Sequence, residues 1–144
     1  MPTPTPKIMS TEAQNLVRRP NFAHLATLRA DGSPKLDPVW IDLTDESTVT
    51  IATGQDSLKT RNVLRDPRVA ISIVDVDNPY EELQLRGTCV VEPDPDMATL
   101  DELSHKYTGK PFPSRGDDSV VLRITVNQFL HQDLSFEHTP AGQD

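Results

Sequence analysis

The segment 53–62 has the residue types of an anion-binding site. It leaves a predicted strand, turns at Gly54, and enters a predicted helix whose first turn carries Ser57, Lys59 and Arg61. Unpaired N–H groups and the positive end of the helix dipole favour an anion at a helix start. A hydroxyl, an ammonium and a guanidinium group add strong hydrogen bonds to phosphate. The pattern therefore fits a phosphate site, or else basic side chains that only solvate a helix surface.

A second candidate lies in the run Asp37-Pro38-Val39-Trp40, inside a strand that otherwise alternates. Pro38 has no N–H to donate to a neighbouring strand, so this position is an edge or a bulge. A bulge leaves backbone groups available to a ligand, and Trp40 could pack beside a planar ring. The alternative is that the sole tryptophan belongs to the core and that Pro38 protects a sheet edge.

The chain offers no other catalytic constellation. Its four histidines are scattered without metal-ligand spacing, and the single Cys89 cannot form an internal disulfide or a zinc site. No nucleophile-elbow, Walker or Rossmann glycine pattern occurs. We expect no catalytic side chain and no metal. If the protein is an enzyme, a bound cofactor must carry the chemistry.

Composition narrows the class of protein further. The 144 residues fit one domain, and the net charge of −8 argues against non-specific nucleic-acid binding. No apolar run is long enough to span a membrane, and the N-terminus lacks a signal-peptide pattern. We therefore expect a cytoplasmic protein with no membrane partner.

Alternating apolar residues predict six strands, and helical spacing predicts three short helices between them. We expect an α+β domain, mainly β, forming a closed or half-closed antiparallel barrel over residues 10–136. A flexible proline-rich arm (1–9) precedes it and a frayed polar tail (137–144) follows. The expected strands are 22–28, 36–43, 49–53, 68–76, 82–91 and 119–129, and the expected helices are 10–19, 56–65 and one from Asp94 or Asp96 to Gly109.

Several motifs occur in an order that resembles a known family. The hairpin 25–34 and Pro38-Val39-Trp40 resemble the opening of the pyridoxamine-phosphate-oxidase-like split β-barrels. The run 59–69 is similar to their Lys-x-Arg-Asn-Leu-x-x-Asp-Pro-Arg-Val signature, and the segments 78–80, 85–88 and 107–113 also match. The combination is most like group B of the flavin/deazaflavin oxidoreductases, many of which use coenzyme F420.

The resemblance implies a homodimer with two equivalent cofactor sites at the subunit interface. In this family the reduced cofactor passes a hydride to the substrate, and no dedicated catalytic side chain is usual. The residues implied are Thr27, Pro38, Val39 and Trp40 at the ring, Ala52 and Thr53 along the ribityl chain, Ser57, Leu58, Lys59, Arg61 and Asn62 at the phosphate end, and Tyr80 of the other subunit over the ring.

The leading hypothesis is an F420-dependent reductase that acts on a small conjugated, quinone-like or tetrapyrrole compound. An FMN-dependent oxidoreductase on the same fold and a non-catalytic carrier of flavin or deazaflavin are the alternatives. FMN and F420 share the tricyclic ring, the ribityl chain and the first phosphate, so the phosphate site cannot separate them. The polyglutamate tail of F420 needs further basic groups, for which Lys7, Arg18, Arg19 and Arg65 are candidates.

Overall fold

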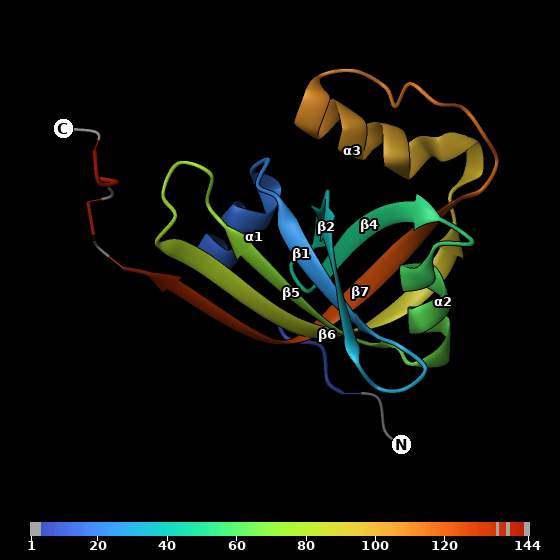
Figure 1. The fold of residues 1–144 in the computed structure, drawn as a ribbon, viewed down its shortest axis with the longest axis horizontal. Coiled ribbons are helices and arrows are strands. Elements are labelled where there is room, and N and C mark those ends of the chain that lie inside the picture. Colours follow the sequence, from blue (N-terminus) through green and yellow to red (C-terminus); the bar gives the residue numbers. More distant parts are fainter. Residues whose placement is uncertain (1–3, 135, 138, 143–144) are drawn as a thin grey trace.

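A single antiparallel sheet of seven strands, in the order β2-β1-β5-β6-β7-β4-β3, forms the framework of the protein (Figure 1). The computed structural model describes residues 4–134, 136–137 and 139–142. The strands are β1 (Ala23–Leu28), β2 (Pro34–Val39), β3 (Asp42–Asp45), β4 (Thr48–Gly54), β5 (Arg68–Val74), β6 (Glu81–Pro93) and β7 (Ser119–Asp133). The helices are α1 (Thr11–Arg18), α2 (Leu58–Arg65) and α3 (Ala98–Thr108), which follows the single 3-10 turn η1 (Pro95–Met97).

The prediction of six strands was wrong by one. The expected strand 36–43 is two strands, β2 and β3, separated by Trp40 and Ile41. The break occurs because the backbone of Ile41 bonds to side chains of α3 and not to another strand. Its N–H donates to the Tyr107 hydroxyl, and its carbonyl accepts from Lys106 and Tyr107.

The helices begin and end where capping residues place them. The Ser10 hydroxyl accepts from a backbone N–H in the first turn of α1, and the Ser57 hydroxyl does the same in α2. The carboxylate of Asp94 accepts from two backbone N–H groups of α3. Gly109 ends α3 with a φ of 76°, a left-handed conformation that glycine adopts without strain.

The core lies inside the curve of the sheet. Buried side chains alternate with more exposed ones along β1, β5 and most of β6, and α1 packs against β3, β5 and β6. The largest side chains without exposed surface belong to Leu16, Leu25, Ile41, Ile51, Ile73, Leu83, Leu122 and Ile124. Aliphatic packing thus holds the sheet in its curved shape.

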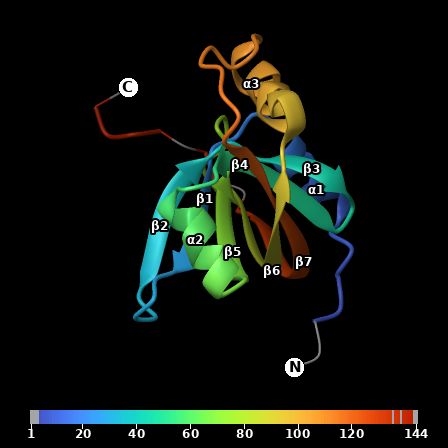
Figure 2. The ribbon, with the colours of Figure 1, turned by 90° about the vertical axis from the view of Figure 1, so that its right-hand side faces the viewer.

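The two edge strands of the sheet are neighbours in sequence. β2 and β3 are joined through Trp40 and Ile41, and no ladder joins them among the described residues. The curved sheet therefore stays open between β2 on one side and β4 with β3 on the other. Figure 2 shows α2 beside this opening and α3 across its upper end.

The structure describes only parts of the two terminal segments. Of the predicted arm, residues 1–3 lie outside the described residues, whereas Lys7 donates its N–H to the Val126 carbonyl and Met9 donates to Glu46. The predicted frayed tail lies partly outside them, at residues 138 and 143–144. In the part of the chain that the structure describes, no helix is long and apolar enough to cross a membrane.

Gly87 sits at a bulge in the ladder between β6 and β7 and allows a close approach of their backbones. A Cβ atom at this position would lie 2.4 Å from the carbonyl oxygen of Thr125. We therefore expect Gly87→Ala to lower the free energy of unfolding by about 1–3 kcal/mol, the usual cost of overpacking. Urea denaturation measures the change. Gly54→Ala is the control, since its Cβ would meet only an ordinary contact at 3.5 Å, and equal stability of the two variants would contradict the prediction.

Candidate functional site

A groove of about 610 Å³ opens at the split between the two sheet edges. Its walls are the ends of β2 and β4, the first turn of α2, α3, and the loop of residues 110–118. Six of the predicted site residues line this groove: Pro38, Val39, Trp40, Ala52, Thr53 and Lys59. The structure thus brings together two segments that are separate in the sequence, 38–40 and 52–59.

The start of α2 forms the basic end of the groove. The Ser57 hydroxyl accepts the Thr60 N–H, and the Thr60 hydroxyl donates to the Gly54 carbonyl, which fixes the turn into the helix. The N–H groups of Leu58 and Lys59 have no acceptor among the described residues. These two N–H groups point from the positive end of the helix dipole and are available to an anion.

Lys59 is half-buried in the groove, and its ammonium group makes no ion pair or hydrogen bond within the described part of the chain. Arg61 is exposed and does not line the groove. Seven acidic residues elsewhere hold basic partners, for example Asp101 with Arg115 and Glu92 with Arg123. The groove therefore carries a positive charge that no carboxylate of the described residues neutralises, although the chain as a whole has a net charge of −8.

Asn62 and Thr27 contact each other and do not line the groove. Both are buried, and the Asn62 amide donates to the Thr27 hydroxyl at 3.0 Å. Arg65 donates to the Asn62 side-chain oxygen at 2.7 Å and to the Leu28 carbonyl at 2.9 Å. These bonds tie α2 to β1 and hold the position of the helix start. Asn62, a residue of the signature-like run 59–69, therefore holds the start of α2 in position without lining the groove.

Aromatic side chains form the other end of the groove. The Trp40 ring stacks on Tyr107 with a centroid distance of 5.4 Å and an interplanar angle of 8°. Phe112 meets Trp40 edge-on at 6.3 Å, and Phe22 packs on Tyr107 at 5.7 Å. This cluster fixes Trp40 in one orientation, with Phe22 and Phe112 beside it in the wall of the groove. The sequence motif 107–113 matched the family, but it gave no sign of this packing.

Lys106 and Tyr107 attach α3 to the break between β2 and β3. The Lys106 ammonium donates to the carbonyls of Val17 and Ile41 at 2.6 Å each, and to Asp42 at 3.3 Å. Burial lowers the pKa of Lys106, and Asp42 opposes that shift. Burial also raises the pKa of the Tyr107 hydroxyl, which donates to the backbone carbonyl of Asn21, between α1 and β1. The two side chains are thus structural, and they hold the wall that carries Trp40.

The loop of residues 110–118 is held against α3 by one ion pair. Arg115 binds both carboxylate oxygens of Asp101, at 2.8 and 3.1 Å, and Asp101 also accepts the Phe112 N–H. The Arg115 guanidinium holds the pKa of Asp101 below its usual range. Residues 112, 114, 115, 116 and 118 of this loop line the groove, so the loop contributes to the shape of the pocket.

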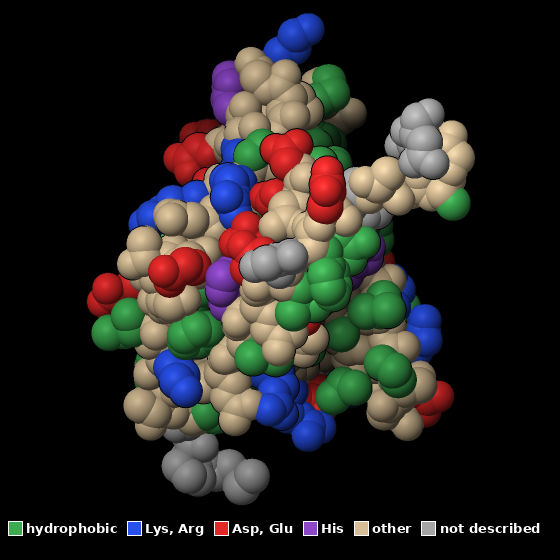
Figure 3. All heavy atoms as spheres, turned by 90° about the vertical axis from the view of Figure 1, so that its left-hand side faces the viewer, with side chains coloured by type: hydrophobic (Ala, Val, Ile, Leu, Met, Phe, Trp, Pro, Cys, Tyr) green, Lys and Arg blue, Asp and Glu red, His purple; other side chains and the backbone are tan. Residues whose placement is uncertain are grey.

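Tyr80 lies away from the groove of its own chain. It lies in the turn between β5 and β6. β5 begins just after α2 and is seven residues long, so this turn is at the end of the strand away from α2. Its ring meets Phe136 edge-on at 4.9 Å, and its carbonyl accepts the Leu134 N–H. Acidic side chains gather at this end of the sheet (Figure 3). Within one chain, Tyr80 does not join the other predicted site residues.

The basic residues considered for a polyglutamate tail are engaged elsewhere. Arg19 pairs with Asp75 and Glu81, and Arg65 holds Asn62. Lys7 lies over the Phe129 ring at 5.8 Å, and Arg18 bonds to side chains of its own helix. None of the four lines the groove.

The part of the chain that the structure describes contains neither a reactive thiol nor a metal-binding cluster. Cys89 is buried, and burial raises its pKa to about 12, so its thiolate is not available near neutral pH. Among the described residues, no group of three or more His, Cys, Asp or Glu side chains could hold a metal ion. The arrangement can bind an elongated molecule with a planar end against aromatic side chains and an anionic end at α2.

The comparison with protein families agrees with this arrangement. The family model for pyridoxamine 5′-phosphate oxidase matches residues 9–133. The chain belongs to this family. The match spans the whole groove, from the end of the N-terminal arm to the end of β7.

Solved structures share the same fold. An F420 reductase is 31% identical, with a TM-score of 0.77 over 85% of this chain and 98% of that chain. A conserved hypothetical protein from Mycobacterium tuberculosis is 22% identical, with a TM-score of 0.71 over 99% of this chain and 98% of that one. A putative pyridoxamine 5′-phosphate oxidase from Lactobacillus delbrueckii is 20% identical, with a TM-score of 0.64 over 85% and 93%. The last two show the fold alone.

The Lys106 contacts predict a stability effect. Lys106→Met keeps an unbranched side chain of similar length but leaves the Val17 and Ile41 carbonyls without the ammonium donor. We expect the free energy of unfolding to fall by about 1.5–3 kcal/mol, the range for hydrogen bonds to a charged group. We also expect the fluorescence of Trp40 to change as its wall loosens. Lys110→Met, at an exposed lysine, is the control. Equal stability of the two variants would show that the hydrogen bonds of Lys106 do not stabilise the fold.

Proposed function

We propose that the protein is an oxidoreductase that binds a flavin-type cofactor in the groove, with F420 as the cofactor and FMN as the alternative. The observation that carries the proposal is the unpaired Lys59 ammonium beside two available N–H groups at the start of α2. When bound, such a cofactor supplies hydride transfer. The residues of the chain bind and orient it.

The basic end of the groove fits a phosphate group. A phosphate has several acceptor oxygens, and the N–H groups of Leu58 and Lys59 together with the Lys59 ammonium are donors only. The Ser57 hydroxyl is already engaged in capping, so it supports the turn more than it supplies a new donor. Arg61 adds positive charge from the exposed side of α2.

The remaining walls fit a planar ring joined to a polar chain. Trp40, Val39 and Pro38 give an apolar surface near α3, and Ala52 and Thr53 continue it towards α2. The groove volume of about 610 Å³ lies within the roughly 300–1,000 Å³ of small-molecule sites. The loop of residues 110–118 lines the aromatic end, where its Phe112 meets Trp40 edge-on.

The choice of F420 is supported by the 31% identity to a solved F420 reductase. FMN remains the alternative because Lys7, Arg18, Arg19 and Arg65 are all engaged away from the groove. We propose a small conjugated, quinone-like or tetrapyrrole compound as the substrate. Titration of the protein with each cofactor tests the choice, and micromolar affinity for FMN alone would overturn F420. Binding without turnover of these substrate classes would indicate a carrier.

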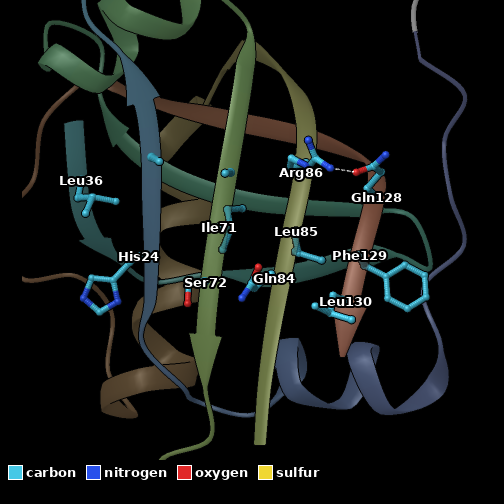
Figure 4. Close-up of a pocket in the computed structure, with 12 residues that line it drawn as sticks. His24, Leu36, Ile71, Ser72, Gln84, Leu85, Arg86, Gln128, Phe129 and Leu130 are labelled. Carbon is cyan, nitrogen blue, oxygen red and sulfur yellow. Dashed lines mark hydrogen bonds between the residues drawn. The ribbon is translucent and has the colours of Figure 1, made fainter. Parts of the chain in front are cut away.

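We further propose that two chains pair through the outer face of the sheet. A hollow of about 640 Å³ lies there across β2, β1, β5, β6 and β7. Its floor has the small residues Ala26, Ala70 and Ser72, and its rims carry Leu36 and Leu130, which are 67% and 48% exposed (Figure 4). A second copy of this face would cover those leucines, and the pairing would allow Tyr80 of the partner subunit to reach the groove.

The pairing predicts a dimer by light scattering at micromolar concentration. Ala70→Asp places a charge in the floor of the hollow and should produce monomers, because like charges would meet across the symmetric interface. Leu64→Asp introduces the same charge at an exposed leucine of α2, outside the hollow, and as the control it should stay dimeric. A wild-type monomer, or dimers of both variants, would exclude this face as the interface.

The phosphate contact predicts a loss of affinity that depends on the ligand. Lys59→Ala should weaken FMN binding by about 10- to 100-fold, since a charge-assisted hydrogen bond contributes roughly 1.5–3 kcal/mol. Riboflavin lacks the phosphate, so its affinity should not change. Fluorescence titration measures both ligands, with Lys110→Ala as the control. An equal loss for riboflavin would mean that Lys59 does not bind the phosphate.

A further inference from the structure

Phe22 is an exposed aromatic residue of the groove to which the proposed cofactor contacts give no role. Its side chain is 59% exposed, it lines the groove, and its ring packs on Tyr107 with a centroid distance of 5.7 Å. A single exposed apolar residue is ordinary on a protein surface. Phe22 differs from such a residue because it lies in the wall of a pocket and because the chain around it is fixed.

The backbone before Phe22 is held by Asn21, which is buried. The Asn21 side chain donates to the Leu16 carbonyl at 3.0 Å and accepts the Val76 N–H at 2.9 Å. Its backbone carbonyl accepts the Tyr107 hydroxyl at 2.5 Å. Contacts from α1, α3 and the segment after β5 therefore meet at this residue. The Phe22 ring is presented to the groove in a fixed position, which lowers the entropy that a ligand would lose on binding to it.

Phe22, Trp40 and Phe112 together give the groove more aromatic surface than the cofactor ring is proposed to use. Tyr107 stacks on Trp40 and also contacts Phe22, and Phe112 meets Trp40 edge-on. The proposed function places the cofactor ring against Trp40 and the end of β2. Phe22 and Phe112 remain in the wall of the groove as a surface for a second planar molecule, because aromatic rings favour stacked and edge-on contacts with one another.

The aromatic end of the groove offers no unpaired charge among the described residues. Three charged residues line the groove, and one of them, Lys59, belongs to the first turn of α2. Asp118 lies beside the turn into that helix, since a Cβ atom at Gly54 would be 3.5 Å from its Oδ2. The third, Arg115, binds both carboxylate oxygens of Asp101. A carboxylate on the second molecule would lose its water here without gaining a free cation.

We propose that Phe22 is a specificity-determining residue, which holds the ring of an uncharged, planar, hydride-accepting compound beside the bound cofactor. The inference rests on the proposed function and narrows its substrate to neutral quinone-like compounds, because the common tetrapyrroles carry carboxylate side chains. In the reaction, the quinone gains a hydride and a proton and becomes the hydroquinone, and the reduced cofactor is the source of both.

The experiment measures the binding of naphthoquinone by calorimetry, with the protein loaded with whichever of F420 and FMN binds more tightly. Phe22→Leu should weaken the binding, and raise the KM for naphthoquinone, by about 3- to 10-fold, the usual contribution of an aromatic pair beyond its buried area. Phe22→Tyr keeps the ring and should bind normally. Cofactor affinity and the melting temperature of the ligand-free protein should stay unchanged. Leu64→Ala, at an exposed leucine outside the groove, is the control.

Naphthoquinone sulfonate tests the charge of the substrate, because it has the same ring with one negative charge. We expect it to bind at least about 10-fold more weakly than naphthoquinone, since no free cation meets it. Equal binding of the two compounds would overturn the preference for an uncharged molecule. Unchanged naphthoquinone binding in Phe22→Leu would overturn the role of Phe22.

The remaining outcomes separate this inference from the function on which it rests. An equal loss of cofactor affinity in Phe22→Leu would place the ring at the cofactor, and a change from dimer to monomer would place it at a subunit contact; either result overturns the inference. A wild type that binds cofactor but no naphthoquinone would also overturn it and leave the proposed function standing. A wild type that binds neither FMN nor F420 would overturn the proposed function itself.

Discussion

The attachment of α3 to the backbone of Ile41 is the interaction on which the site depends. A continuous strand through this point would extend one edge of the sheet and leave no corner for the groove. Instead, Lys106 and Tyr107 satisfy the Ile41 carbonyl and N–H, and the chain turns from β2 into β3. The same contacts fix the stack of Tyr107 on Trp40. One set of hydrogen bonds therefore opens the sheet and builds the aromatic wall beside the opening.

The opposite wall depends on a second buried contact. Asn62 and Thr27 join α2 to β1, and Arg65 fills the remaining acceptor of the Asn62 side chain. This arrangement leaves Lys59, one turn earlier, in the wall of the groove, and no carboxylate of the described residues pairs with it. The family membership and the groove geometry agree because the family signature begins with Lys59, which lines the groove, and continues with Asn62, which holds the helix start in place.

Local signals in the sequence were sufficient for most elements. The capping residues Ser10 and Ser57 and the stop at Gly109 act within one turn, so the three helices were predicted close to their observed bounds. The break at Ile41 was missed because its partners, Lys106 and Tyr107, are 65 and 66 residues away in the sequence. The burial of Asn62 was missed for the same reason, since Thr27 is 35 residues away. Contacts of this range follow from the topology and not from local residue patterns.

The edge strand β2 has a further consequence for how the protein associates. Pro34 and Pro38 lack N–H groups, and the ion pair of Lys35 and Asp37 lies on its inner side. A strand from another molecule that added here would find missing donors and would bury charges against an apolar neighbour. The open edge is thus protected against strand-by-strand growth into fibrils or aggregates. The strand that contributes Pro38 and Val39 to the groove thus also keeps an incompletely closed sheet from polymerising.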